Sequence, residues 1–321
     1  MIWKRSAARL RAFSCAFLLA SVAVAQLPEG VTQSGVDVWS DGTRLSGDLF
    51  LPPGFSEDDE RGVVVLAHGW GGTRDHLNQA YAPFLAAEGF VALTIDYRGW
   101  GDSDSRLVAQ EGMPKTPDAT GTVSLEAIAV REEVDPLDQT EDIRNAITWV
   151  QGQPGVDPER IGLWGSSYSG GHVIWVAAHD PRVKVTVSQV GSMDSKGIIE
   201  TLDGGWQALH ALERARARGD AAPYAEIPAR EGLRGTPDYV SMAQYSPRDV
   251  AHRSQAAAMI IDAEKEELFD IKEHGQAVHA ILKNRVPTEY HVIPGITHYG
   301  IYREAREQAL KLAIDWYRQH L

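Results

Sequence analysis

The chain has 321 residues, of which 43% are hydrophobic and 23% charged, and its formal net charge is −13 at pH 7. These proportions are ordinary for a globular protein and exclude the disordered and fibrous classes. The excess of acidic residues argues against nucleic acid or an anionic membrane as a partner. The length suffices for one large α/β domain.

The first 25 residues differ from the rest of the chain. Four basic residues precede an apolar stretch at 12–24, and Ala23-Val24-Ala25 has the small residues that a signal peptidase requires. This order predicts a signal peptide over residues 1–25, cleavage before Gln26 and a secreted or periplasmic protein without a stable membrane anchor. An uncleaved anchor is disfavoured because the apolar stretch is short for a membrane span.

Cleavage at that site would change the composition in two ways. The formal net charge would move from −13 to −17, since only basic residues leave. The single cysteine, Cys15, would leave as well. A mature chain without cysteine can have no disulfide, no thiolate nucleophile and no cysteine-ligated metal.

Alternating apolar and polar residues at 36–40 and 44–51 flank Asp41-Gly42, and this pattern predicts a β-hairpin with a tight turn. Continuous apolar runs, typical of strands buried on both faces, then alternate with helical stretches such as 138–150 and the amphipathic C-terminal run. The alternation predicts an α/β fold with a mostly parallel, doubly wound sheet and an antiparallel hairpin at its N-terminal edge. The predicted buried strands are 63–67, 91–95, 160–164, 183–190, 258–261 and 290–293.

Two stretches, 103–134 and 191–254, fit this alternation poorly. Structureless loops of such length are rare in compact domains. The second contains helical pieces and follows a predicted strand. We therefore expect residues 26–321 to form one domain, with residues 191–254 inserted as a helical cap over the active site.

The sequence GSSYSGG at 165–171 follows the strand at 160–164 and precedes an apolar helical stretch. A nucleophile elbow has this context, because a sharp strand-to-helix turn projects a serine above the sheet and requires small neighbours. Ser167 is the predicted nucleophile. The usual G-x-S-x-G form is altered at its last position, where Ser169 replaces glycine but is still small.

Two glycine-bounded loops supply the other predicted groups. The sequence HGWGG at 68–72 follows a buried strand, and we expect the N–H of Trp70 to stabilise an oxyanion together with the N–H of Tyr168. His298 lies in the loop PGITHYG at 294–300, where the chain order serine, acid, histidine requires the general base.

The acid should follow the strand at 258–261, to accept the second imidazole N–H. We choose Glu266, because four or five residues give the loop room to turn toward His298. The alternatives in the same loop are Asp262, Glu264 and Glu267, and most of the four should be ordinary solvated charges.

Aromatic residues near these motifs are candidates for substrate binding: Trp100, Trp206, Tyr299 and Tyr97. No metal or cofactor is expected. His172 and His179 lie seven residues apart with no carboxylate at ligand spacing, and no HExxH motif occurs.

The motifs HGWGG, DYRGWGDS at 96–103, GSSYSGG, AEKEELF and GITHYGIY occur in an order that resembles the α/β-hydrolase superfamily, in its dienelactone-hydrolase-like and X-prolyl-peptidase-like branch. The resemblance covers residues 36–321 and implies a cofactor-free Ser-His-acid mechanism on an acyl compound. Relatives generally have Asp at the position of Glu266. The peptidases generally use a tyrosine hydroxyl in the oxyanion hole, which Trp70 lacks, and this difference favours an esterase.

The predicted function is therefore an exported serine hydrolase that cleaves a carboxylic ester or lactone through an acyl-enzyme. An X-prolyl-type peptidase and an acyltransferase are the alternatives, since both would use the same residues. The expected partners are a small-molecule ester, a lactone or a short peptide, and the sequence leaves the oligomeric state open.

Overall fold

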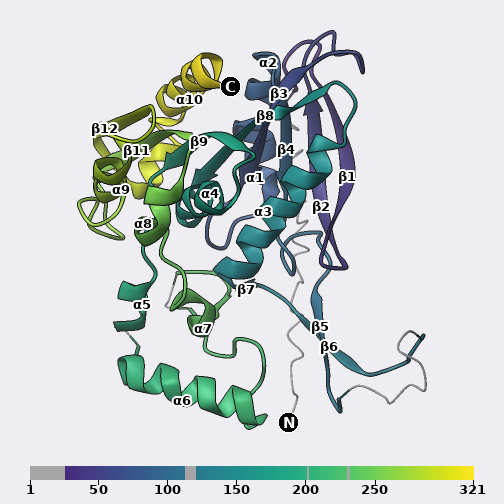
Figure 1. Ribbon diagram of the computed structural model, residues 1–321, viewed down its shortest axis with the longest axis vertical. Helices are drawn as coiled ribbons and strands as arrows, with labels where there is room; N and C mark the ends of the chain where they lie inside the picture. The colour runs from purple at the N-terminus through teal and green to yellow at the C-terminus, as the bar shows by residue number, and fades with distance from the viewer. Residues whose placement is uncertain (1–25, 113–120, 201, 230–231) are drawn as a thin grey trace, which may run out of the picture.

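The computed structural model of the chain describes residues 26–112, 121–200, 202–229 and 232–321 (Figure 1). The predicted signal peptide at 1–25 lies outside these residues. Among the residues so described, no helix has the length and apolar character needed to cross a membrane.

An eight-stranded sheet in the order β1-β2-β4-β3-β8-β9-β11-β12 forms the centre of the molecule. β1 and β2 are antiparallel, β2 pairs antiparallel with β4, and every pair from β4 to β12 is parallel. The predicted α/β-hydrolase fold, with a mostly parallel sheet and an N-terminal hairpin, is thereby confirmed. The strands are β1 (Thr32–Ser40), β2 (Thr43–Leu51), β3 (Arg61–Ala67), β4 (Val91–Ile95), β8 (Val156–Ser166), β9 (Val183–Gln189), β11 (Ala257–Lys265) and β12 (Thr288–Thr297).

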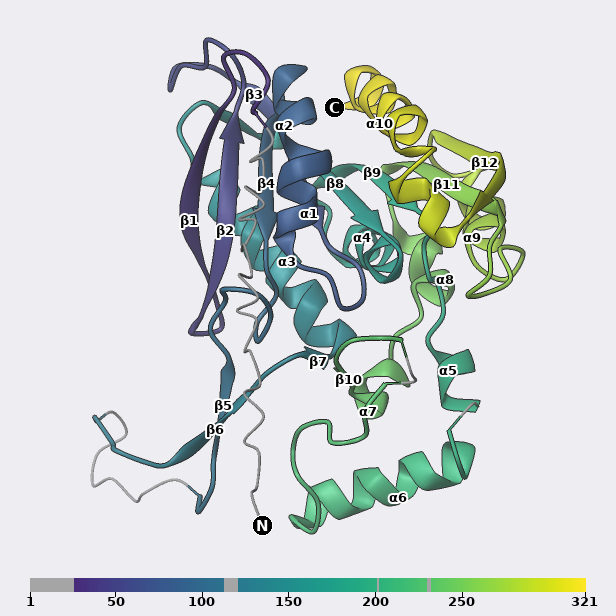
Figure 2. The same cartoon turned by 180° about the vertical axis from the view of Figure 1, so that it is seen from behind.

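Helices cover both faces of the sheet (Figures 1 and 2). One face packs on α3 (Pro136–Gln151), α4 (Tyr168–His179) and α9 (Gly275–Leu282). The other packs on α1 (Arg74–Ala80), α2 (Ala82–Ala87) and α10 (Arg306–His320). Because both faces are covered, the inner strands are apolar throughout, and all five residues of β4 are buried.

The stretch 103–134, for which the sequence predicted no element, forms an arm. β5 (Arg106–Ala109) pairs antiparallel with β6 (Ala127–Val130), and the pair extends away from the body of the molecule (Figures 1 and 2). The next strand, β7 (Glu133–Val134), pairs in parallel with β10 (Thr236–Pro237) and so joins this stretch to the insertion that follows β9.

Residues 191–254 connect β9 to β11 and contain several helices joined by irregular segments. In both views α5, α6 and α7 lie beyond the end of the sheet at which β8 passes into α4 (Figures 1 and 2). The ion pair between Arg216 and Asp238, at 2.7 Å, joins α6 to the start of α7. The elements of the insertion are α5 (Lys196–Glu200), α6 (Gly205–Arg218), β10, α7 (Tyr239–Met242), α8 (Pro247–Val250) and the 3-10 helix η1 (Ala251–Arg253).

Candidate active site

Ser167 occupies a sharp turn between β8 and α4, with φ 59° and ψ −123°. A positive φ is unfavourable for a residue with a side chain, so the surrounding packing must hold this conformation. A Cβ on Gly165 would lie 2.1 Å from the carbonyl oxygen of Ser169, and one on Gly170 2.6 Å from the Cα of Gly191. The glycines of the motif are therefore required by close backbone contacts.

Ser169, which replaces the usual glycine, stabilises the turn. Its hydroxyl donates to the carbonyl oxygen of Ala67 at 2.7 Å and accepts the N–H of Ser166 at 2.8 Å. The side chain is fully buried. The altered position therefore ties the end of β3 to the elbow.

His298 lies between Ser167 and Glu266. Its Nε2 is 3.0 Å from Ser167 Oγ, and its Nδ1 is 2.9 and 2.8 Å from the two carboxylate oxygens of Glu266. The side chains of His298 and Glu266 are 1% and 2% exposed. A carboxylate only accepts, so Nδ1 carries the proton and Nε2 of the neutral ring is free to accept from the serine hydroxyl.

The other three carboxylates of the acid loop have different contacts. Asp262 is fully buried and accepts from the hydroxyl of Tyr290 at 3.0 Å. Glu264 accepts the backbone N–H of Gly295 at 2.7 Å, and Glu267 accepts that of His298 at 2.6 Å. Of the four carboxylates, Glu264 and Glu267 are exposed, as expected for solvated charges, and each also accepts a backbone N–H near His298. The side chains of Asp262 and Glu266 are instead buried.

The two residues expected to provide oxyanion N–H groups, Trp70 and Tyr168, both line the cavity at Ser167. Tyr168 is the first residue of α4, so its N–H belongs to the helix-terminal amides that have no partner within the helix. A Cβ on Gly69 would lie 2.7 Å from Ser166 O and 3.0 Å from Ser167 Cβ, so only glycine allows the Trp70 loop to approach this closely. The rings of Trp70 and Tyr168 are 5.2 Å apart.

A cavity of about 660 Å³ opens beside Ser167 and His298. Trp70, Tyr168 and Tyr299 line it, and the insertion at 191–254 supplies part of its wall. Most of the remaining lining is apolar or aromatic, and it includes Ile198, Leu233, Pro237, Tyr239, Leu268, Phe269 and Tyr302, together with the polar residues His76, Ser192, Asp194 and His274.

Three of the four aromatic candidates lie elsewhere. Trp100 is fully buried, and its indole N–H donates to Glu133 O at 2.7 Å. Tyr97 is also buried, with its ring 4.3 Å from that of His68. Trp206, in α6, is 38% exposed and is not part of the cavity wall. These residues pack the core or face solvent, so only Tyr299 lies where a substrate could touch it.

Sequence reasoning missed Tyr302 and His274. The hydroxyl of Tyr302 is 2.7 Å from Ser166 Oγ, beside the nucleophile, and burial raises the pKa of this phenol, which keeps it protonated. The only sequence signal was its position four residues after His298, in the motif GITHYGIY. His274 carried no signal, since it precedes α9 outside every motif.

Two other histidines are buried and neutral. Burial lowers the pKa of His68 to about 3 and that of His172 to about 3. His172 Nε2 lies 2.9 Å from Gln139 Oε1, while its Nδ1 lies 2.6 Å from the hydroxyl of Tyr245. These contacts satisfy the imidazole inside the core. In the part of the chain that the structure describes, no group of three or more His, Cys, Asp or Glu side chains is arranged to hold a metal.

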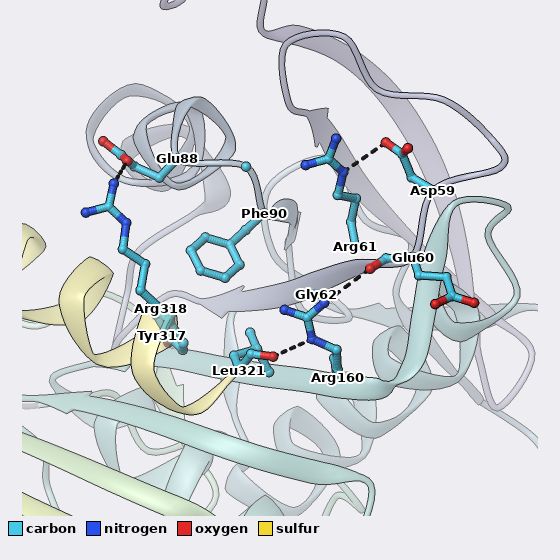
Figure 3. A pocket seen from close by; sticks show the side chains of 11 residues that line it. Asp59, Glu60, Arg61, Gly62, Glu88, Phe90, Arg160, Tyr317, Arg318 and Leu321 are labelled. Atoms are coloured by element: carbon cyan, nitrogen blue, oxygen red, sulfur yellow. Dashed lines mark hydrogen bonds and ion pairs between the residues drawn. The ribbon is translucent and has the colours of Figure 1, made fainter.

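A second cavity, of about 430 Å³, lies beside Arg61 and Gly62 at the start of β3, away from the elbow. Figure 3 shows the side chains that line it. Four of the charged side chains that line it form ion pairs, Arg61 with Asp59 and Arg318 with Glu88. Arg160 binds the carbonyl oxygens of Glu60 and Leu321. Figure 3 shows these contacts, and none of them involves a residue of the serine site.

Sequence comparison matches the chain to a protein family and to several known proteins. Residues 41–263 match the family described as X-Pro dipeptidyl-peptidase (S15 family). An uncharacterized 31.7 kDa protein in the traX-finO intergenic region of Escherichia coli is 26% identical over 286 residues, which cover 81% of this chain and 91% of that protein. The quorum-quenching protein AidA of Acinetobacter baumannii is 34% identical over 161 residues, 50% of this chain and 44% of that protein.

Among solved structures, the alpha/beta hydrolase GrgF from Penicillium superposes with a TM-score of 0.66 at 19% identity. The superposition covers 90% of this chain and 99% of that one. At this identity the similarity shows the shared fold alone.

Proposed function

The chain belongs to the X-Pro dipeptidyl-peptidase (S15) family of hydrolases, and from this premise we propose that it is an exported serine hydrolase of carboxylic esters or lactones. The observation that carries the proposal is the hydrogen-bonded series Glu266–His298–Ser167, with Nε2 of His298 at 3.0 Å from Ser167 Oγ. A serine is a weak nucleophile unless an adjacent base removes its proton, and this series supplies such a base.

The reaction has two steps. His298 takes the proton of Ser167 as Oγ bonds to the carbonyl carbon, and the same proton then passes from Nε2 to the departing alcohol. The negative oxygen formed in between accepts the N–H groups of Trp70 and Tyr168, each worth about 3–4 kcal/mol in comparable sites. Water, deprotonated by His298, then attacks the acyl-enzyme and releases the acid and Ser167.

The cavity favours a neutral acyl compound over a peptide with a free N-terminus. A dipeptidyl-peptidase must hold a positively charged amine, and a carboxylate without a cationic partner is the usual way to do so. Asp194 is the one carboxylate among the described lining residues, and it is paired with Arg248 at 2.7 Å. It also accepts the backbone N–H of Lys196 at 2.9 Å. The charge of Asp194 is thus already compensated.

Labelling with a fluorophosphonate probe tests the nucleophile. We expect the protein to be labelled, Ser167→Ala to abolish the label and His298→Ala to reduce it strongly. Three classes of substrate are then compared: p-nitrophenyl esters, lactones and X-Pro p-nitroanilides. We expect the protein to cleave the esters and lactones but not the anilides. Labelling that survives Ser167→Ala would contradict the site, and preferential cleavage of the anilides would contradict the ester proposal.

Export is tested separately, by sequencing the N-terminus of the protein expressed from the full coding sequence in a bacterial host. We expect an N-terminus at Gln26 and recovery outside the cytoplasm, because residues 1–25 have the order of a signal peptide. A protein that retains Met1 and stays in the cytoplasm would contradict this part of the proposal without affecting the serine chemistry.

A further inference from the structure

His274 faces the cavity beside Ser167, and the proposed reaction does not use it. Phe269 packs on its ring, with centroids 4.4 Å apart and planes 30° apart. The same Phe269 contacts His298, at 5.8 Å between centroids. The phenyl ring of Phe269 thus contacts both imidazoles, and His274, Phe269 and His298 line the same cavity.

The backbone after β9 fixes both His274 and the nucleophile. The N–H of Ser192 donates to the carbonyl oxygen of Ser167 at 3.1 Å. The next N–H, that of Met193, donates to Nδ1 of His274 at 2.8 Å. Two successive backbone amides thus hold the His274 ring at a fixed position relative to Ser167. A side chain held in this way can orient a substrate relative to the nucleophile.

The hydrogen bond from Met193 determines where the proton of His274 lies. A backbone N–H can only donate, so Nδ1 of His274 accepts and carries no proton. Burial lowers the pKa of His274, and the ring is therefore neutral near pH 7. Its proton is then on Nε2, for which no acceptor occurs among the described residues.

The cavity that His274 lines is largely apolar, and its other polar lining residues include His76, Ser192 and Asp194. Leu268 and Phe269 are apolar, and Asp194 is occupied by Arg248 and by the N–H of Lys196. A largely apolar cavity with a donor fixed at one point binds best a ligand that presents an acceptor there, because an unmatched polar group would be desolvated without compensation.

We propose that Nε2–H of His274 determines specificity by binding a second, neutral oxygen of the substrate, apart from the acyl bond that Ser167 attacks. The substrate class is then an ester or lactone with a largely apolar skeleton that also carries a carbonyl, hydroxyl or ether oxygen. This inference rests on the proposed hydrolase function of the same site.

Paired substrates test the proposal. Each pair has the same alcohol leaving group and the same chain length, and one member carries a keto or hydroxyl oxygen at successive positions of the acyl chain. We expect the wild type to prefer one oxygenated member, and His274→Leu to reduce that preference, as a ratio of kcat/KM, by about tenfold. His274→Gln should keep part of it, because its amide can accept from Met193 and still donate into the cavity.

His279→Leu, in the helix α9 that begins directly after His274 but outside the cavity, is the matched control and should leave the ratio unchanged. A ratio that His274→Leu leaves unchanged, or an equal loss for both members of every pair, would overturn the inference while the hydrolase function stands.

A wild type that cleaves neither member would instead overturn the proposed function. The same pairs, prepared as unreactive amides, can then be titrated calorimetrically into Ser167→Ala. If His274 binds the second oxygen, Ser167→Ala should bind the oxygenated amide more tightly than its partner. The double variant Ser167→Ala/His274→Leu should bind the two amides equally. Equal affinities for the two amides would overturn the inference.

Discussion

The carboxylate of Glu267 accepts the backbone N–H of His298 at 2.6 Å, while its neighbour Glu266 binds the imidazole of the same residue. Glu264 accepts the N–H of Gly295 in the same loop. Three carboxylates in β11 or just after it therefore hold the end of β12 and His298, the residue that follows β12. One orients the imidazole and two fix the backbone that carries it, so the ring has little freedom to turn away from Ser167.

Glu267→Ala should lower kcat about tenfold, because the backbone of His298 loses its acceptor and the imidazole samples unproductive positions. Glu267→Gln should retain most of the activity, since an amide oxygen can accept the same N–H. Initial rates with a chromogenic ester give both values. Equal losses in the two variants would indicate that the charge of Glu267, and not its hydrogen bond, is what matters.

Glu266→Gln should lower kcat by about 10³ to 10⁴, because an amide cannot stabilise the imidazolium and can reverse the tautomer of His298. Fluorophosphonate labelling should slow in parallel. Glu264→Gln, in the same loop, is the control and should remain close to wild type, since its amide oxygen can still accept from Gly295. A fully active Glu266→Gln would assign the acid to another residue.

Asp262 predicts a dependence of stability on pH. It is buried, only Tyr290 donates to it among the described residues, and a Cβ on Gly275 would lie 2.0 Å from its Oδ2. Burial, with a smaller contribution from the charge of Glu266, raises the pKa of Asp262 to about 7. The folded state therefore favours the protonated carboxyl. Its contribution to stability is complete below the unfolded pKa, near 4, and is lost as the pH rises through 7.

Asp262→Asn removes this titration. From pH 4 to pH 7 the free energy of unfolding of the variant should rise relative to wild type, by at most about 1.4 kcal/mol per pH unit, the limit for one group. Urea denaturation at several pH values measures the difference. Tyr290→Phe should move the transition to higher pH, because the hydrogen bond from Tyr290 lowers the pKa of Asp262. Parallel curves for wild type and Asp262→Asn would contradict the assignment.

The fold and two of the site positions could be predicted because each has a local signal. Apolar runs bounded by turns identified six strands of the sheet, since strands covered on both faces must be apolar. The alternating pattern around Asp41-Gly42 identified the other two. Ser167 was recognisable by its strand–turn–helix context, and His298 by its glycine-bounded loop after the last strand. The structure brings these two residues together with Glu266.

The choice among the four acids had no local signal. Strand side chains alternate strictly, so Asp262 and Glu264 would share a face with Glu266 in a regular strand. The pairing of β11 with β12 instead shifts register between Ala263 and Lys265. Such an irregularity redirects the side chains that follow it, and it depends on tertiary contacts that the sequence does not display.

Trp100 shows a second limit of sequence reasoning. It lies in a motif shared with the resembling family, but its indole is buried and donates to Glu133 O. The local sequence does not distinguish a tryptophan buried in the core from one that lines a pocket. Only the packing of distant residues, here Gly235 of the insertion against the Trp100 ring, distinguishes them.

Trp70 joins the predicted oxyanion loop to the insertion at 191–254. Its indole N–H donates to the carbonyl oxygen of Arg234 at 3.0 Å, and Arg234 in turn pairs with Glu132 at 2.5 Å. The nearby N–H of Thr236 donates to Glu132 O at 2.8 Å. The insertion is thus held to the core at the edge of the cavity.

Trp70→Phe keeps an aromatic ring and the backbone N–H but loses the bond to Arg234. One such hydrogen bond contributes about 1 kcal/mol, so amide exchange at Thr236 should become roughly fivefold faster. Hydrogen–deuterium exchange of peptides containing Thr236 measures this change. Trp206→Phe, on the exposed side of α6 in the same insertion, is the matched control and should leave the exchange rate unchanged. Equal rates in wild type and Trp70→Phe would mean that contacts other than the indole hold the insertion closed.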